Sequence, residues 1–178
     1  MPDGPIYSLN GITPKIAPDA FVAPTAAVIG DVEVGSESGI WFHCLVRGDM
    51  NFIHIGARTN IQDGAIIHVD SGAFSTTIGD DVTVGHNAVI HACTLKDRAF
   101  VGIAATVLDG AVIEEGGMLG AGGLLTPGKV IGRNELWVGS PARLVRMMSD
   151  EERRKFDLNA EVYRELAAQF RAGLRSAT

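Results

Sequence analysis

The sequence predicts an all-β solenoid, a parallel β-helix of hexapeptide repeats, followed by one C-terminal α-helix. Two observations lead to this prediction. Aliphatic residues recur every six positions along most of the chain, and the last part of the chain instead has apolar residues at helical spacing. A period of six fits neither an α-helix nor a long strand, whereas hexapeptide repeats are the signature of parallel β-solenoids. Each repeat is therefore expected to form one flat face of a prism.

The aliphatic positions fall into four runs of constant six-residue spacing. In chain order they are Ile16, Val22, Val28, Val34, Ile40 and Val46; Ile55, Ile61 and Ile67; Ile78, Val84 and Ile90; and Leu95, Val101, Val107, Ile113, Leu119, Leu125, Ile131 and Trp137. Small residues such as Gly56, Gly85, Ala65 and Ala88 lie between many of these positions. They let the chain turn tightly and let successive coils stack closely. The break at residues 70–77 is interpreted as an excursion at a corner of the prism.

A C-terminal helix is predicted for about residues 149–173. Ser149 followed by Glu152 forms a capping-box pattern at its start. The apolar residues that follow at helical spacing are Phe156, Tyr163, Leu166, Phe170 and Leu174. This stripe should pack the helix against the prism. The expected division is a β-helix domain with an N-terminal lead-in at residues 1–145 and the helix at residues 146–178.

Composition narrows the possible functions. The chain has 178 residues, of which 46% are hydrophobic but only 6% aromatic, and this fits one domain with a core of Val, Ile, Leu and Ala. The net charge is −6, and the Lys and Arg residues form no block. We therefore expect no nucleic-acid partner and no binding to an anionic membrane surface. No stretch is long and apolar enough to span a bilayer, and no signal-peptide pattern is present, so a cytoplasmic protein is expected.

The two cysteines, Cys44 and Cys93, do not make a disulfide framework. Cys44 lies four residues after Ile40, at the small inward position of its repeat. We therefore interpret it as a buried thiol and not as a nucleophile.

Three residues are predicted to form one outward-facing column. Arg47, His68 and His91 each directly follow an aliphatic residue that should occupy the same face on successive coils. Neighbouring strands of a sheet lie about 4.8 Å apart, which lets the two histidines bind a single ion. The repeat thus predicts a metal site on the surface of the β-helix.

His86 does not belong to that column. It lies two positions beyond Val84, on the adjacent face, where its partner one coil earlier is Asp63. Side chains that leave different faces of a prism diverge, so His86 should not meet the other two histidines within one chain. A threefold assembly would lay this part of one subunit against the column of its neighbour, in a heterologous contact that closes into a ring.

Three segments closely resemble the γ-class carbonic anhydrase family: RGDMNFIHIGARTNIQDGAIIHVD, VGHNAVIHACT and GSPARLVR, which begin at residues 47, 84 and 139. The six-residue pattern over roughly residues 16–142 also resembles the left-handed β-helix of the hexapeptide-repeat superfamily. Members of the anhydrase family are homotrimers that hold zinc, or another divalent metal, with three histidines at the subunit interface. The resemblance assigns these ligands to His68 and His91 of one subunit and His86 of its neighbour. Zinc is expected, and iron or cobalt also suits three imidazoles.

The same resemblance assigns roles to four further residues. Gln62 and Asp63 would lie close to the metal-bound water, and Arg47 and Asp49 would pair across the interface. Zinc held by three imidazoles keeps one position open for water and lowers the pKa of that water to about 7. Hydroxide could then attack CO2 and give bicarbonate. Gln62 would orient the nucleophile, and Asp63 would act as an acceptor or electrostatic neighbour.

The sequence departs from the family's best catalysts in its acidic residues. Those catalysts carry proton-transferring glutamates after the RGD motif and in the loop that follows the first histidine. Here Met50 follows the motif, residues 71–77 contain no acid, and only Asp70 is near. The sequence therefore leaves three alternatives open: a slow anhydrase, an inactive relative, or an enzyme that uses the same metal-bound water on another substrate. Tyr163 also matches a tyrosine in the family's C-terminal helix.

Two other functions remain open on the sequence. Many hexapeptide-repeat proteins are acyltransferases and some close relatives are thioesterases, so transfer or hydrolysis of an acyl group from coenzyme A is one alternative. Such enzymes generally rely on one histidine base and not on three that converge on a metal. The other alternative is a non-catalytic, metal-binding trimeric assembly protein.

Overall fold

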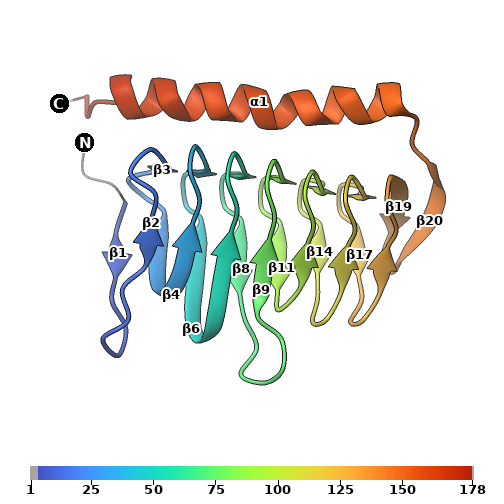
Figure 1. The fold of residues 1–178 in the computed structure, drawn as a ribbon, viewed down its shortest axis with the longest axis horizontal. Helices are drawn as coiled ribbons and strands as arrows, with labels where there is room; N and C mark the ends of the chain where they lie inside the picture. Colours follow the sequence, from blue (N-terminus) through green and yellow to red (C-terminus); the bar gives the residue numbers. More distant parts are fainter. Residues whose placement is uncertain (1–3, 178) are drawn as a thin grey trace.

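The chain folds into a long parallel β-solenoid with one helix, α1 (Asp150–Gly173), lying along it (Figure 1). The computed structural model describes residues 4–177. The strands are β1 (Ile6–Tyr7), β2 (Lys15–Ile16), β3 (Phe21–Val22), β4 (Ala27–Val34), β5 (Gly39–Ile40), β6 (Leu45–Ile55), β7 (Asn60–Ile61), β8 (Ile66–His68), β9 (Thr76–Ile78), β10 (Thr83–Val84), β11 (Val89–His91), β12 (Thr94–Leu95), β13 (Phe100–Val101), β14 (Thr106–Val107), β15 (Val112–Ile113), β16 (Met118–Leu119), β17 (Leu124–Leu125), β18 (Val130–Ile131), β19 (Glu135–Gly139) and β20 (Ala142–Met147).

Three faces make up the prism. The first face contains the first halves of β4 and β6, followed by β8, β11, β14 and β17. The second face contains β2, the second halves of β4 and β6, and then β9, β12, β15 and β18. The third face runs from β3 through β5, β7, β10, β13 and β16 to β19, and β20 pairs antiparallel with β19 at its end. The prediction of a parallel β-solenoid with a C-terminal helix is therefore confirmed.

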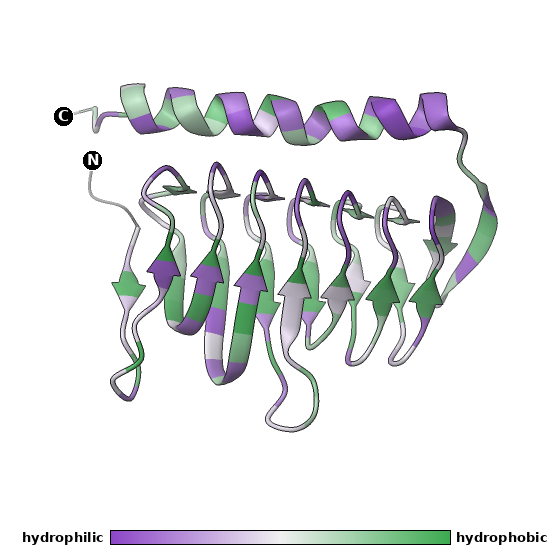
Figure 2. Cartoon of the chain, viewed as in Figure 1, coloured by the Kyte–Doolittle hydropathy of each residue, from purple (hydrophilic) through white to green (hydrophobic). Residues whose placement is uncertain are grey.

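Parallel pairing between coils aligns the aliphatic positions. Val46 lies beside Ile67, which lies beside Ile90, and Ile61 lies beside Val84. These side chains point inward, and Figure 2 shows apolar residues in the strands with hydrophilic residues in many of the turns. The largest fully buried side chains are Ile40, Ile53, Ile55, Ile61, Ile67, Ile78, Ile90, Leu95, Ile113, Leu119, Leu125 and Ile131. Glycine lets coils approach closely: a Cβ added at Gly56 would lie 2.6 Å from the carbonyl carbon of Gly79.

The interruption of the repeat lies at one corner, as predicted. Strand β6 continues around this corner, because its start pairs with β8 and its end pairs with β9. One coil later, the chain between β8 and β9 leaves the prism at the same corner as a loop of residues 69–75 (Figure 1). The loop lengthens this coil without shifting the strands that follow it. The six-residue register therefore resumes in β9.

Helix α1 is capped and packed as the sequence predicts. Ser149 is the N-cap, and both hydrogen bonds of its capping box with Glu152 are present. Tyr163 and Phe170 pack edge-on against Trp41, with ring centroids 5.3 and 5.2 Å away. Among the described residues we find no helix with the length and apolar character needed to traverse a bilayer.

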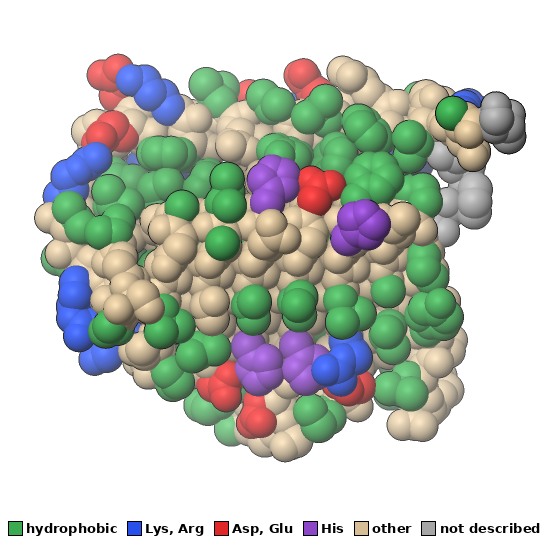
Figure 3. Space-filling model, turned by 180° about the vertical axis from the view of Figure 1, so that it is seen from behind, with side chains coloured by type: hydrophobic (Ala, Val, Ile, Leu, Met, Phe, Trp, Pro, Cys, Tyr) green, Lys and Arg blue, Asp and Glu red, His purple; other side chains and the backbone are tan. Residues whose placement is uncertain are grey.

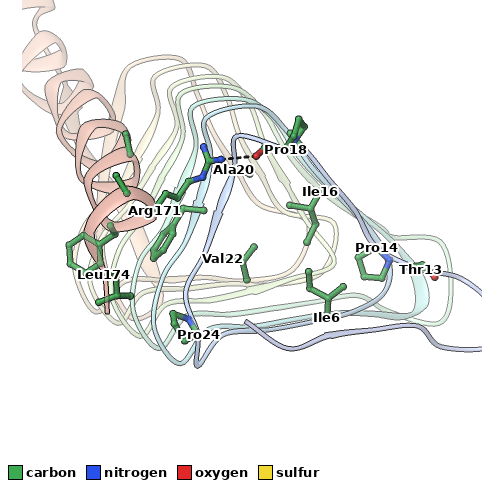
Figure 4. A pocket seen from close by; sticks show the side chains of 15 residues that line it. Ile6, Thr13, Pro14, Ile16, Pro18, Ala20, Val22, Pro24, Arg171 and Leu174 are labelled. Carbon is green, nitrogen blue, oxygen red and sulfur yellow. Dashed lines mark hydrogen bonds between the residues drawn. The ribbon is translucent and has the colours of Figure 1, made fainter. Parts of the chain in front are cut away.

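The N-terminal end of the prism is open. Figure 4 looks into a cavity of about 800 Å³ between the first coil and the last turn of α1. Arg171 closes one side of it by donating hydrogen bonds to the backbone oxygens of Pro18 and Asp19, at 2.8 and 2.7 Å. The end of the helix is thereby tied to the first coil.

Cys44 is a buried thiol, as predicted. It is 2% exposed, and its Sγ donates to the backbone oxygen of Gln62 at 3.1 Å. Burial raises the pKa of this thiol to about 12. It is therefore uncharged at neutral pH and unsuited to nucleophilic attack.

The capping box gives a pH-dependent prediction. Hydrogen bonds from Arg146 and from the backbone of Ser149 lower the pKa of Glu152 from 4.5 to about 2. A depressed pKa means that this carboxylate contributes stability above pH 4.5 and that the contribution is lost as the pH falls through about 2. We expect Glu152→Gln to lower the thermal midpoint at neutral pH by a few degrees at most. The difference from the unmodified protein should shrink as the pH is lowered.

Circular dichroism melts at several pH values would measure this effect. Glu151→Gln is the matched control, since Glu151 is exposed and takes no part in the capping box. A deficit of equal size at pH 2 and pH 7 would contradict the role given to the charge of Glu152.

Candidate metal centre

His68 and His91 lie side by side at the end of the first face. They are the last residues of β8 and β11, and the parallel register pairs them directly. Nδ1 of His68 lies 3.2 Å from Nε2 of His91, and the ring centroids are 5.1 Å apart. The predicted column is therefore confirmed for these two side chains. Both are largely buried, with side chains 13% and 30% exposed.

A carboxylate holds each of these two rings. Oδ1 of Asp49 lies 2.9 Å from Nε2 of His68, and Oδ1 of Asp109 lies 2.5 Å from Nδ1 of His91. Asp49 also pairs with Arg47 of the same chain. Burial acts to raise the pKa of Asp49, but the hydrogen bonds from His68 and from its own backbone, with the charge of Arg47, outweigh it and lower that pKa. Asp49 is therefore a carboxylate at neutral pH.

His86 lies elsewhere, in the turn between β10 and β11. The sequence placed it on the face that contains β10, and the structure corrects this: Gly85 ends that face, and the turn carries His86 to the corner beside the first face. The histidine pair lies at the far end of β11, so the width of the first face separates the two positions. Figure 3 shows the histidines in two separate groups on this side of the molecule. Within residues 4–177, no three His, Cys, Asp or Glu side chains converge as a metal site.

A carboxylate and a phenol flank His86. Oδ2 of Asp63 lies 3.1 Å from Nδ1 of His86, as expected from their stacked positions, and the hydroxyl of Tyr163 lies 3.3 Å from Nε2. Burial, with a smaller contribution from the charge of Asp63, raises the pKa of Tyr163. The hydroxyl therefore keeps its proton at neutral pH. Tyr163 reaches this position because α1 packs along the third face.

Gln62 completes this second group. It follows β7 directly, is 4% exposed, and its Nε2 donates to Oδ1 of Asn60 at 3.0 Å. The predicted residues, together with Asp109, thus fall into two clusters, which we name the pair cluster (Arg47, Asp49, His68, His91 and Asp109) and the His86 cluster (Gln62, Asp63, His86 and Tyr163). Asp109 was not predicted. It lies two residues beyond Val107, and Val107 occupies the position of Ile90 one coil later. Stacking the repeats could therefore have placed Asp109 on the coil next to His91.

The pair cluster has the spacing that a metal needs. Two imidazole nitrogens bound to one tetrahedral zinc at 2.0–2.1 Å lie about 3.3 Å apart. The facing nitrogens of His68 and His91 are 3.2 Å apart. A carboxylate on the second nitrogen of a metal-binding imidazole is also the usual arrangement, because it fixes the tautomer and the ring orientation. The donor set therefore fits a divalent metal, and one chain supplies two of the imidazoles.

No family model matches the chain. It is 48% identical over 160 residues to the protein named gamma carbonic anhydrase 2, mitochondrial, of Arabidopsis thaliana, covering 87% of this chain and 58% of that protein. The chain thus spans somewhat over half the length of this relative. It is 40% identical over 167 residues to a carbonic anhydrase of Geobacillus kaustophilus, covering 94% of this chain and 91% of that protein.

The chain belongs to the γ-carbonic anhydrase family. The resemblance drawn from the RGD and NIQD segments is thereby confirmed. A crystal structure named as a hexapeptide transferase family protein from Anaplasma phagocytophilum is also similar, with a TM-score of 0.89 and 43% identity over 96% of this chain and 98% of that one. The fold of the present chain is accordingly the left-handed parallel β-helix of hexapeptide repeats.

Asp109 gives a prediction about metal affinity in this γ-carbonic anhydrase relative. Its carboxylate orients His91, and loss of such a partner typically weakens metal binding 10–100-fold. We expect Asp109→Asn to weaken zinc binding within this range, measured by competition with a chromophoric chelator. Asp31→Asn is the control, because it removes one exposed carboxylate outside both clusters. Unchanged affinity in Asp109→Asn would show that this carboxylate does not support metal binding through His91.

Proposed function

We propose that this chain is a metal-dependent γ-carbonic anhydrase that hydrates CO2 reversibly to bicarbonate at the subunit interfaces of a homotrimer. The observation that supports this most directly is that each of the three histidines has a carboxylate partner: Asp49 for His68, Asp109 for His91 and Asp63 for His86. His68 and His91 of one subunit, with His86 of a neighbour, would hold the metal. When bound, zinc would lower the pKa of a coordinated water to about 7 and make hydroxide available at neutral pH.

The surface between the two clusters supports assembly. Along the first face the outward residues Leu45, Ile66, Val89, Thr106 and Leu124, all apolar except Thr106, alternate with inward residues that are fully buried. Ile66 is 42% exposed in the single chain. An apolar row of this kind gains free energy when a second surface covers it. A neighbour that covers it would bring its own His86 cluster to the pair cluster in a closed ring.

Each residue near the metal would have a distinct task. The three aspartates would accept hydrogen bonds from the imidazoles and keep the metal-facing nitrogens in position. Gln62, held by Asn60, would orient the water and CO2 with its buried amide. The resemblance implies that Arg47 and Asp49 pair between subunits, whereas Arg47 here contacts Asp49 of its own chain. In our proposal this pair steadies the carboxylate that holds His68.

Release of the proton is expected to limit the rate of the reaction at this site. Met50 is 52% exposed beside the pair cluster, and Phe74 in the neighbouring loop is 47% exposed. Neither side chain can carry a proton to buffer. We therefore propose a slow anhydrase, in which zinc is the expected metal and iron or cobalt would also suit the imidazoles. A cytoplasmic location stays a prediction from the sequence.

A second candidate is transfer or hydrolysis of an acyl group from coenzyme A. The name of the similar Anaplasma structure, a hexapeptide transferase family protein, favours it. The two proposals differ in their need for metal, because an acyltransferase of this fold generally uses one histidine base. Acyl-CoA turnover that persists after metal removal would favour the transferase. A non-catalytic assembly protein is the third possibility, and it predicts bound metal without turnover of either substrate.

The site at the interface can be tested with His86→Ala. We expect this variant to form trimers that lack stoichiometric metal. His54→Ala is the control and should bind metal normally, because His54 lies near Glu33, outside both clusters. Mixing His86→Ala with the double variant His68→Ala/His91→Ala should restore one intact site per mixed trimer, because each parent supplies the half that the other lacks. Elemental analysis and sedimentation would measure both quantities. Full metal content in His86→Ala, or no restoration on mixing, would refute the shared site.

Stopped-flow CO2 hydration on zinc-loaded and cobalt-loaded protein tests the reaction itself. We expect a rate above background but limited by proton transfer. Met50→Glu should raise it on the order of tenfold, below the 10²–10⁴-fold that a well-placed acid or base contributes. Met147→Glu is the control, since Met147 is exposed at the far end of the prism, in β20. No rate above background with metal confirmed would reject the anhydrase proposal.

A further inference from the structure

A cavity of about 330 Å³ lies beside His86, between the third face of the prism and α1. The residues around it are Gln62, Gly85, His86, Phe100, Gly102, Ile103, Met118, Ala121, Asn159 and Tyr163. They include no Lys, Arg, Asp or Glu. A cationic ligand would therefore find no carboxylate among these residues, and an anionic ligand could pair only with His86, whose two ring nitrogens already face Asp63 and Tyr163. A neutral ligand suits it better, because burying an unpaired charge is costly.

The cavity is larger than the proposed reaction requires. Its volume is within the usual range for small-molecule sites, roughly 300–1,000 Å³, whereas CO2 has only three atoms. Phe100, Ile103 and Met118 supply apolar wall. An aliphatic chain of several carbons can lie against these side chains.

The helix side of the cavity is polar. Asn159 and Tyr163 lie one turn apart on α1, and the Tyr163 hydroxyl lies 3.3 Å from Nε2 of His86. Oδ1 of Asn159 is buried and has no hydrogen-bond partner among the described residues. A buried acceptor without a donor is unfavourable and uncommon in native proteins. A ligand that carries both a donor and an acceptor would satisfy this amide in either of its two orientations.

We propose that this cavity binds a neutral, short-chain aliphatic primary amide. The carbon chain would lie along Phe100, Ile103 and Met118, and the amide end would lie between Asn159 and Tyr163. This binding needs no metal. It adds to the proposed function a site for a molecule larger than CO2 within reach of His86.

Three probes with the same heavy-atom skeleton test the chemistry: butyramide, pentan-2-one and butyrate. They end in a donor-bearing amide, a methyl ketone and a charged carboxylate. Methyl NMR spectra of metal-free protein, labelled at Ile and Met, would report binding through Ile103 and Met118. We expect butyramide to bind about tenfold more tightly than pentan-2-one, the range of one buried hydrogen bond, and butyrate to bind most weakly. Butyrate equal to butyramide would overturn the proposal, as would absence of shifts at Ile103 and Met118.

Two variants and a control locate the site. Asn159→Leu should abolish the preference for butyramide over pentan-2-one while pentan-2-one still binds. Ala121→Phe should fill the cavity and weaken all three probes. Ala172→Phe adds the same ring beside the other cavity, at the N-terminal end of the prism, and should leave the binding of all three probes unchanged. An unchanged preference in Asn159→Leu, or unchanged binding in Ala121→Phe, would refute the proposal. Because all spectra are recorded on metal-free protein, the result for amide binding does not depend on whether the anhydrase proposal is correct.

Discussion

The parallel hydrogen-bonding register between successive coils is the constraint on which the rest of the structure depends. Coils repeat at the spacing of sheet strands, about 4.8 Å, so residues at equal positions in neighbouring coils must stack. This places His68 against His91 and Ile67 against Ile90. A slip of one residue would turn every inward side chain outward. The fully buried aliphatic residues therefore fix the positions of the polar side chains that follow them.

The helix serves both the core and the site. Its aromatic side chains cover the third face and contact Trp41, which would otherwise be open to solvent. The same packing brings Tyr163 to His86 and Asn159 to the neighbouring cavity. Arg171 ties the end of the helix to the first coil, so the helix is held along its length. The element that closes the core thus also builds one wall of the His86 cluster.

The six-residue repeat predicts the positions of the residues that follow it, but it does not predict contacts that depend on other parts of the fold. The six-residue repeat was enough to predict the fold, the column of His68 and His91, and the stacking of Asp63 with His86. It did not identify Asp109 as the partner of His91, because the two residues occupy unequal positions of neighbouring coils: Asp109 lies two residues beyond Val107, whereas His91 directly follows Ile90. The corner position of His86 was missed because the six-residue spacing does not show at which residue the chain turns from one face to the next. Contacts from α1, such as Tyr163 with His86, depend on where the helix lies on the prism, and its sequence gives only the face that is buried.

The separation of the two clusters links metal binding to assembly. One chain presents two oriented imidazoles at one end of the first face and the third at the other end, so a single chain cannot surround an ion with all three. In the proposed trimer, any metal that prefers the complete site must stabilise the trimer, and the trimer must raise the metal affinity to the same extent. The aspartates reduce the cost of this step, because the rings are already oriented before the subunits meet. Assembly would then complete the site without remodelling either half.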